Sequence, residues 1–504
     1  MPLAETCHPN PSSLSVDPAT RFKLAIIGGG ISGLAAALRA YELAQQSGRE
    51  VSITIFEASP RLGGVLRTER IGEYLVEHAA DMWITNKPEA TRLCEKLGLA
   101  DRLIPTVEKF RRSLVLRGGR AHPVPEGFQL MVPEQAWPML RSPLLSWRGK
   151  LRLLSEFFVR ARRNGADESL ADFVRRRCGR EVFERLVQPL VGGIYTADPE
   201  KLSLKATLPR FIDMEQQHGS LIRAALRQSR QRSSAESAGT SGARYGLFVS
   251  LPNGIEELVS ALSRRVAEFA DIRCSVPVQR VIRTPTSGRP DVGVRSTFAI
   301  ETNVAQHFDA VILAVPSFVA ARLLADGCPA LSSELARIEY ASTVVVASGH
   351  KLADIEHPLD AFGLVIPHIE RHKLLAVSFT SRKFPGRAPD GHVLLRTFIG
   401  GALQPELCDL DDSAIVELVR RELTELLGVR GEPDFVRVFR HSRAMPQYHV
   451  GHLDLIASIQ TKSANHPGLA LAGSYLTGVG IPDSIASGEA AAEAIVSYSS
   501  RGRE

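Results

Sequence analysis

A glycine-rich turn near the start of the chain has the residue types and spacing of a dinucleotide-binding motif. Gly28, Gly30 and Gly33 form G-x-G-x-x-G directly after a short apolar run, and the Ala/Leu-rich stretch 31–46 follows at once. In this motif the first glycine permits a tight turn and the second lets the backbone approach a pyrophosphate. The third allows close packing of helix on strand, and the helix N-terminus faces the phosphate charge. The predicted chemistry is dinucleotide binding.

Glu57 adds the acidic residue that this motif uses to hold a ribose. It follows the β-branched run 51–56, which is typical of a second parallel strand. A carboxylate at this position accepts hydrogen bonds from the ribose hydroxyls. It would also repel a phosphate on that ribose. The pattern therefore leaves NAD or FAD as the ligand.

The elements that must position these residues form a βαβ unit. Strand 24–27, the glycine turn, helix 31–46 and strand 51–56 follow one another within about 30 residues. Helical sequence is predicted between about 133 and 230. Further predictions are a hairpin over 114–125 with its turn at Gly118 and Gly119, strands at 276–282, 310–316, 340–349, 393–399 and 469–473, and a closing helix at 484–497.

Length and composition exclude several classes of protein. The 504 residues predict about three domains. A net charge of +6 is too small for the dense basic surface of a nucleic-acid binder. Six scattered cysteines with no C-x-x-C pair predict neither a metal site nor thiol redox chemistry. No apolar run reaches the ~18 residues of a spanning helix, and residues 1–20 are expected to be a disordered leader.

The residues after the second strand resemble a known flavoprotein pattern. Glu57-Ala-Ser-Pro-Arg61-Leu-Gly63-Gly64 is similar to the extended fingerprint of the FAD-dependent amine oxidase and desaturase superfamily. The resemblance implies that Arg61 contacts the dinucleotide and that the two glycines let the chain pass close to it. It therefore favours FAD over NAD.

A second segment, Leu471-Ala-Gly473-Ser-Tyr-Leu-Thr-Gly478-Val-Gly480-Ile-Pro-Asp483, resembles the C-terminal motif of the same superfamily. The resemblance implies that a helix N-terminus here points at the flavin and stabilises its reduced, anionic form. Asp483 or Ser484 would serve equally well as an ordinary helix cap. No cysteine follows Cys408, so non-covalent FAD is expected.

The resemblance implies FAD contacts along six parts of the chain. One part departs from the pattern, because Ala79 and Ala80 stand where relatives have Gly-Pro, in the segment that passes the flavin. The implied cofactor-binding residues are Gly28, Gly29, Gly30, Ile31, Ser32, Gly33, Glu57, Ala58, Arg61, Gly63, Gly64, Ala79, Ala80, Asp81, Met82, Val278, Ala314, Gly473, Val479, Gly480 and Ile481.

Two central motifs narrow the resemblance. The run 188–203, with Gly193-Ile194-Tyr195, and the run 247–258 are similar to the FAD-dependent protoporphyrinogen oxidase family of haem biosynthesis. The family implies a six-electron oxidation of protoporphyrinogen IX to the porphyrin, with dioxygen as acceptor and no protein nucleophile. Alternatives are coproporphyrinogen III as substrate, a flavin amine oxidase or desaturase, and a non-catalytic FAD-binding scaffold.

The substrate site must hold a flat apolar ring that carries carboxylates. Arginine is suited to the carboxylates because its planar fork binds them bidentately. Arg102 is the candidate anchor, with Arg111 and Arg112 nearby, although each also fits a solvated surface arginine. The candidate apolar residues, for which core packing is the alternative, are Leu364, Ile366, Phe379 and Phe398.

The basic helical stretch 141–180 permits three interpretations. It is a solvated face, a surface that docks on anionic lipid, or a nucleic-acid site, and nothing else in the chain supports the third. Trp147, Leu151, Phe157 and Phe158 lie between the basic residues, as in peripheral membrane segments. A cytoplasmic protein, held at the inner face of the cytoplasmic membrane, is expected. A homodimer is compatible with the resemblance.

The fold class expected is α/β, with a discontinuous Rossmann-type FAD domain, a β-rich substrate domain and an inserted helical domain. The nucleotide-binding motifs lie at both ends of the chain, which predicts a domain assembled from separate segments. The expected boundaries are 21–103, 246–300 and 466–504 for the FAD domain, 104–125 and 301–465 for the substrate domain, 126–230 for the helical domain, and 231–245 for a flexible loop.

Overall fold

The glycine motif lies in a five-stranded sheet whose strands are all parallel. In this computed structural model, which describes residues 21–133, 136–162, 165–227, 247–284 and 297–501, neighbouring strands pair in register at the centre of the sheet. The order across the sheet is β12 (Ala270–Arg273), β2 (Val51–Phe56), β1 (Phe22–Ile27), β16 (Ala310–Leu313) and β22 (Leu469–Leu471).

This order makes β1 the point at which the chain reverses its direction across the sheet. The second and third strands along the chain, β2 and β12, lie to one side of β1, and the fourth and fifth, β16 and β22, lie to the other. Ligands of open α/β sheets bind outside the carboxyl ends of the strands at such a point. The predicted βαβ unit is confirmed, because β1 and β2 flank helix α1 (Ile31–Gln46).

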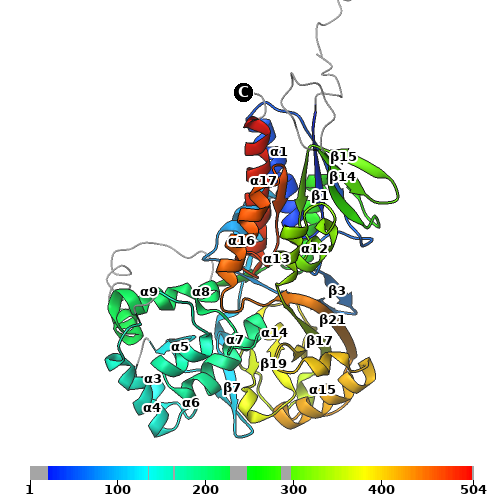
Figure 1. Cartoon of the computed structure of the whole chain (residues 1–504). Helices are drawn as coiled ribbons and strands as arrows, with labels where there is room; N and C mark the ends of the chain where they lie inside the picture. Colours follow the sequence, from blue (N-terminus) through cyan, green and yellow to red (C-terminus); the bar gives the residue numbers. More distant parts are fainter. Residues whose placement is uncertain (1–20, 134–135, 163–164, 228–246, 285–296, 502–504) are drawn as a thin grey trace, which may run out of the picture.

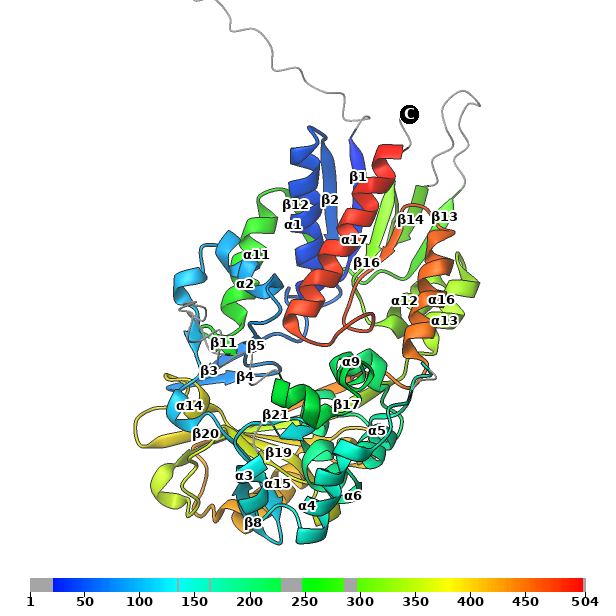
Figure 2. The ribbon, with the colours of Figure 1, turned by 90° about the vertical axis from the view of Figure 1, so that its left-hand side faces the viewer.

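Two helices from opposite ends of the chain cover one face of this sheet. Helix α1 and helix α17 (Ile481–Arg501) lie side by side (Figures 1 and 2). Their backbones approach so closely at Gly488 that a Cβ there would lie 2.1 Å from the carbonyl oxygen of Ser32. The predicted joining of the N- and C-terminal segments is therefore confirmed. Helices α2 (Glu89–Lys96) and α11 (Glu256–Ala267) extend this layer.

The expected domain boundary at residue 300 falls too early, because three helices that follow it pack on the opposite face of the parallel sheet. Apolar residues of α12 (Ser317–Leu324), α13 (Pro329–Ala336) and α16 (His452–Ala464) join one core with β1, β16 and β22. These helices fall within the range 301–465 that was expected in the substrate domain. An antiparallel sheet of β13 (Arg280–Thr284), β14 (Thr297–Glu301) and β15 (Ala305–Phe308) packs beside them, and β13 begins at residue 280 rather than 276.

A seven-stranded sheet forms the second half of the molecule (Figure 1). Helix α15 (Asp412–Leu427) packs on one of its faces through an extensive apolar core. The predicted hairpin is confirmed, since Gly118 and Gly119 adopt positive φ at its turn. In order, the strands are β21 (Phe435–Pro446), β17 (Tyr340–Lys351), β20 (His392–Gly400), β19 (Leu374–Phe379), β18 (Gly363–Val365), β7 (Ser113–Arg117) and β8 (Arg120–Pro123).

The predicted helical region packs around a core of its own. A π-helical turn at Phe183–Val187 interrupts the helix between α6 (Arg180–Val182) and α7 (Gln188–Tyr195). Arg177 is fully buried and pairs with Glu156 and Glu215, which are also buried. Further helices of this region are α3 (Ala136–Arg141), α4 (Trp147–Leu154), α5 (Leu170–Arg177), α8 (Leu204–Thr207) and α9 (Pro209–His218).

Short strands connect the halves. The hairpin β3 (Thr68–Ile71) and β4 (Tyr74–Glu77) leads into the irregular segment 78–82, which we call the linker segment. A small sheet follows, formed by β5 (Trp83–Ile84), β11 (Phe248–Ser250) and β6 (Ile104–Pro105). Helix α14 (Thr380–Lys383) lies between β19 and β20. The expected leader 1–20 and loop 231–245 lie outside the described residues.

Candidate functional site

The carboxyl ends of all five parallel strands meet at one edge of the nucleotide-binding sheet. Gly28 follows β1, Glu57 follows β2 and Ala314 follows β16, while Gly473 follows β22 by two residues. Val278 lies in the loop after β12. The structure thus brings together predicted cofactor residues that are up to about 450 positions apart in the chain, as the switch-point rule for α/β sheets requires.

The three motif glycines have the three different environments that a pyrophosphate site needs. A Cβ on Gly28 would lie 2.3 Å from the carbonyl oxygen of Ala314, and a Cβ on Gly33 would lie 2.0 Å from that of Gly28. Gly28 also has a φ of +105°. By contrast, a Cβ on Gly30 would meet nothing within 4 Å. The open space at Gly30, at the N-terminus of α1, fits an approaching phosphate.

Glu57 is anchored where a ribose-binding carboxylate would be needed. One of its oxygens accepts the N–H of Gly29 at 2.7 Å, and the other accepts the N–H of Ser59 at 2.8 Å. Each carboxylate oxygen keeps a second acceptor site for a ribose hydroxyl. The N–H of Val276 donates to the carbonyl of Glu57, which brings the loop of Val278 alongside. These contacts fit an adenosine ribose at the end of β2.

Arg61 has a role in the structure that the fingerprint alone does not show. Its guanidinium donates to the carbonyls of Leu62, Gly64 and Leu66, and burial lowers its pKa from the ordinary value. It therefore braces the loop that carries Gly63. The N–H of Gly63 donates to the carbonyl of Gly29 at 2.8 Å, so this loop is fastened to the glycine turn.

The C-terminal motif ends at the N-terminus of α17. The N–H of Gly473 donates to the hydroxyl of Ser487 at 2.9 Å, and that glycine has a φ of +143°. Asp483 accepts the N–H of Gly480 and pairs with Lys87 at 2.5 Å. The Asp483 carboxylate thus stands at the positive end of the helix, as a cap.

The linker segment is held by side chains that the sequence analysis does not identify. Three of its five carbonyls accept from three different strands: that of His78 from His441, that of Ala79 from Arg396, and that of Asp81 from Ser250. The Asp81 carboxylate pairs with Lys383 at 3.1 Å and with Arg396 at 3.5 Å. These cations hold the pKa of Asp81 below its ordinary value although its burial raises it.

One signal in the sequence does point to Arg396. It stands alone as a charge in the apolar run 393–399, which was predicted as a strand, and it is 1% exposed. A lone arginine in a buried strand requires a partner. The partners, the Ala79 carbonyl and Asp81, are more than 300 residues away, so they could not be named from the sequence.

The face of the seven-stranded sheet opposite α15 carries a row of apolar side chains. Val365, Ala376, Phe398, Val345 and Phe439 are partners in register across five strands. Four of them are partly exposed, Val345 being the buried one. At one end the Phe439 ring stacks on the His78 ring of the linker segment at 3.9 Å. At the other, Val365 packs against the helical core. We call this row the apolar strip.

Three predicted substrate residues lie on the face of that sheet opposite the apolar strip. Leu364, Ile366 and Phe379 are at most 3% exposed and belong to the core beneath α15. Side chains alternate between the two faces of a strand, so Val365 points away from Leu364. On this strand the residue that belongs to the apolar strip is Val365, one position after Leu364. Phe398, which was also considered, does lie on the apolar strip.

The arginines proposed as carboxylate anchors are already engaged on the surface. The Arg102 guanidinium pairs with Glu257 of α11, within the nucleotide-binding half. Arg112 pairs with Asp360, and Arg111 donates to the carbonyl of Thr106. Arg102 therefore belongs to an exposed ion pair rather than to the apolar strip. The structure does not support it as an anchor.

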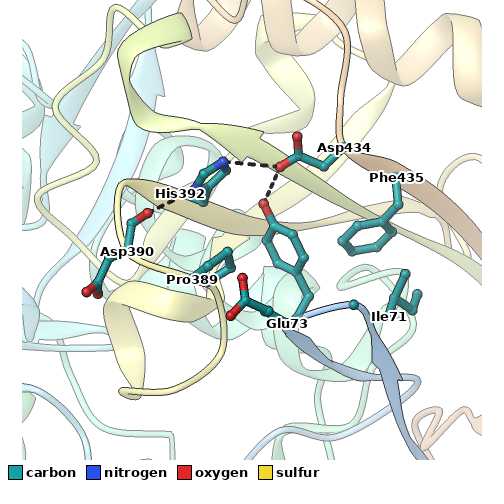
Figure 3. A pocket seen from close by; sticks show the side chains of 9 residues that line it. Ile71, Glu73, Pro389, Asp390, His392, Asp434 and Phe435 are labelled. Carbon is teal, nitrogen blue, oxygen red and sulfur yellow. Dashed lines mark hydrogen bonds and ion pairs between the residues drawn. The ribbon is translucent and has the colours of Figure 1, made fainter.

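A surface pocket of about 640 Å³ opens elsewhere, at the tip of the β3–β4 hairpin (Figure 3). The hydroxyl of Tyr74 donates to Asp434 at 2.5 Å, and His392 lies 3.6 Å from the same carboxylate. Burial and this bond raise the pKa of Tyr74. The lining contains none of the predicted cofactor or substrate residues, being formed by Ile71, Gly72, Glu73, Tyr74, Pro389, Asp390, His392, Asp434 and Phe435.

The glycine turn at the edge of the parallel sheet is typical of a nucleotide-binding α/β protein, here with a second, mixed seven-stranded sheet facing that part of the molecule. Residues 31–496 match the family model described as "Flavin containing amine oxidoreductase". The chain therefore belongs to the flavin-containing amine oxidoreductase family. It is a flavin-dependent oxidoreductase, as the sequence analysis predicted.

Individual relatives align along almost the whole chain. The coproporphyrinogen III oxidase of Bacillus subtilis is 32% identical, covering 94% of this chain and 97% of the relative. Protoporphyrinogen oxidase 2 of Arabidopsis thaliana is 30% identical, covering 96% and 95%. A crystal structure of an Exiguobacterium protein, called "Putative protoporphyrinogen oxidase", superposes with a TM-score of 0.80 at 28% identity, covering 94% and 98%. Among the described helices, each is too short or too polar to span a bilayer.

Proposed function

We propose that this protein is an FAD-dependent oxidase that converts protoporphyrinogen IX to the porphyrin, with dioxygen as the final acceptor. The similarity carries the proposal, because relatives named as porphyrinogen oxidases align across both the nucleotide-binding half and the seven-stranded sheet. Bound FAD would supply the chemistry, by accepting a hydride from the macrocycle in each of three rounds. The protein's own residues would hold the two partners together.

The cofactor would lie, without a covalent bond, along the edge of the parallel sheet at which Gly28, Gly30 and Gly33 form their turn. Its pyrophosphate would face Gly30, its ribose Glu57, and its ring system the linker segment and the loop before α17. The loop 473–481 contains no cysteine to which a flavin could be attached. The apolar strip runs toward the linker segment and offers the flat surface that a macrocycle needs.

Gly30→Ala tests the cofactor assignment with little risk to the fold. Gly30 has a φ of −71° and open space at its Cβ, so the apoprotein should melt at the same temperature as the wild type. The added methyl group would stand where the pyrophosphate lies, so FAD retention should fall. Gly98→Ala, at a remote glycine with φ +71°, is the contrasting variant. It should lower the melting temperature and leave FAD affinity unchanged. Unchanged FAD binding in Gly30→Ala would contradict the assignment.

The substrate is tested by anaerobic reduction of the bound flavin. Protoporphyrinogen IX and coproporphyrinogen III are added separately, the flavin absorbance is followed, and air is then admitted. We expect protoporphyrinogen IX to bleach the flavin and to yield a fluorescent porphyrin in air. Coproporphyrinogen III is the second candidate, because the Bacillus subtilis relative bears that substrate's name. If neither compound bleaches the flavin, the porphyrinogen assignment fails.

We also propose that the helical region docks on an anionic membrane surface. Seven of the fourteen exposed large apolar side chains of the described residues fall between residues 137 and 158, and Phe158 is 81% exposed. Arg141 lies over the Trp137 ring, and Arg223 lies over the Phe157 ring at 4.0 Å. The buried arginines of this region, such as Arg177, serve its core instead. Exposed aromatic residues beside cations suit a lipid headgroup layer.

Vesicle sedimentation tests this surface. Wild-type protein should sediment with phosphatidylglycerol vesicles and less with phosphatidylcholine vesicles. The double variant Trp147→Ser and Phe158→Ser should lose most of this binding. Val304→Ser is the control, since Val304 is 67% exposed but lies between β14 and β15. Equal sedimentation of wild type and double variant would contradict the proposal.

A further inference from the structure

The linker segment has an unusual division of its backbone groups. The carbonyls of His78, Ala79 and Asp81 are each occupied by a side chain from another strand. Within the described residues, the N–H groups of residues 79–82 donate to no acceptor. Buried or half-buried N–H groups normally find a partner. The segment therefore has N–H donors without an acceptor in the described residues, while three of its five carbonyl oxygens already accept hydrogen bonds.

Two of the side chains that hold the linker segment are buried cations. Lys383 and Arg396 are 9% and 1% exposed, and both pair with the carboxylate of Asp81. This set carries two positive charges and one negative charge. Arg387 and Glu77 are buried beside it, and burial raises the pKa of Glu77 to about 7. The neighbourhood therefore keeps a net positive charge at neutral pH.

A buried net charge acts strongly on its surroundings, because the low dielectric of the interior screens it weakly. A flavin that takes up electrons gains negative charge. Cations behind the linker segment, together with its free N–H donors, would stabilise the reduced form more than the oxidised form. The same contacts would fix the distance between the segment and the flavin.

We propose that Lys383, Arg396 and Asp81 are positioning residues that hold the linker segment against FAD and raise the reduction potential of FAD through their net positive charge. The inference rests on the proposed placement of FAD beside residues 79–82. Arg396 reaches the segment through both the Ala79 carbonyl and Asp81, so it is the central member.

Two charge variants should move the reduction potential in opposite directions. Lys383→Met removes a positive charge and should lower the ratio of reduced to oxidised FAD at a fixed dye potential by about tenfold. Asp81→Asn removes the negative charge, keeps an acceptor for Lys383, and should raise that ratio. Lys373→Met is the control, because Lys373 is exposed and its N–H donates to Glu422 of α15. It should leave the ratio unchanged.

Arg396→Lys separates position from charge. It keeps the positive charge but loses the planar fork that reaches both Ala79 and Asp81. The reduction potential should stay near that of the wild type, while FAD is released faster and its visible circular dichroism changes. This variant also remains informative if Lys383→Met fails to fold.

The outcomes distinguish this inference from the proposed function. Wild-type protein that binds no added FAD would overturn both. Wild-type protein that binds FAD, with a potential that shifts in the same direction in Lys383→Met and Asp81→Asn or shifts in neither, would overturn the inference alone. Opposite shifts with an unchanged Lys373→Met control would establish it, since general structural damage has no reason to change sign.

Discussion

The two faces of the seven-stranded sheet are built from the same strands but by different rules. On the face beneath α15, Leu364, Phe379 and Leu395 are all fully buried in one apolar core. On the opposite face, Arg396 binds the linker segment and Phe398 stays partly exposed. The first face holds the sheet together. The second meets the nucleotide-binding half.

This difference teaches that neighbouring residues of one strand can belong to unrelated parts of the molecule. Leu395 packs against α15, whereas the guanidinium of Arg396 donates to the carbonyl of Ala79 in the linker segment. Because the side-chain period of a strand is two, the choice of face decides whether a residue serves stability or the site. The predictions that follow test this separation, beginning with the largest expected effect.

Phe379→Ala should destabilise the protein strongly without touching the site. Phe379 is fully buried in the core beneath α15, so truncation removes packing and leaves a cavity. The free energy of unfolding should fall by about 3–5 kcal/mol. Urea denaturation measures this change, and the spectrum of bound flavin should be unaltered. Phe379→Leu, which keeps more volume, should lose less. A changed flavin spectrum in folded Phe379→Ala would break the separation of the two faces.

Glu77→Gln should change how the free energy of unfolding depends on pH. Burial raises the pKa of Glu77 to about 7, despite hydrogen bonds from Thr68 and Ile255. In the native state this carboxyl holds its proton above its ordinary pKa of 4.5, so it makes stability fall as pH rises from about 4.5 to 7. The contribution amounts to at most about 3 kcal/mol.

The glutamine variant cannot ionise, so its stability should fall less than that of the wild type across this pH range. Urea midpoints between pH 4.5 and 8 measure the difference. Glu73, an exposed residue four positions earlier, provides the control as Glu73→Gln. Parallel curves for wild type and Glu77→Gln would show that Glu77 stays ionised in the fold.

The nucleotide-binding half was predicted well because its signals are local. The glycine turn, helix 31–46 and strand 51–56 lie within 30 residues, and each glycine has a steric reason that can be stated from the sequence. The seven-stranded sheet was predicted only as separate strands. Its register depends on partners such as Val365 and Ala376 that no short motif connects, so the sequence did not reveal that Leu364 faces the core and Val365 the apolar strip.

The linker segment shows a second limit of sequence reasoning. Ala79 and Ala80 were noted as a departure from the pattern, but the side chains that fix this segment come from residues 250, 383, 396 and 441. Buried polar groups require partners, and this requirement predicts that a partner exists without predicting which one. The same limit applies to Arg102, whose partner Glu257 lies in a helix far along the chain.

Val365→Ala should give the smallest change in stability and the clearest change in function. Val365 is partly exposed at one end of the apolar strip, so its truncation should cost under about 1.5 kcal/mol of unfolding free energy. If the macrocycle lies on the strip, the lost contact should raise KM for the porphyrinogen about fivefold with kcat little changed. Leu364→Ala, one residue earlier, is the matched control and should do the reverse, losing about 2–5 kcal/mol of stability while KM is unchanged. Steady-state kinetics and urea denaturation on both variants measure these changes. Equal effects of the two variants on KM would contradict the placement of the macrocycle on the apolar strip.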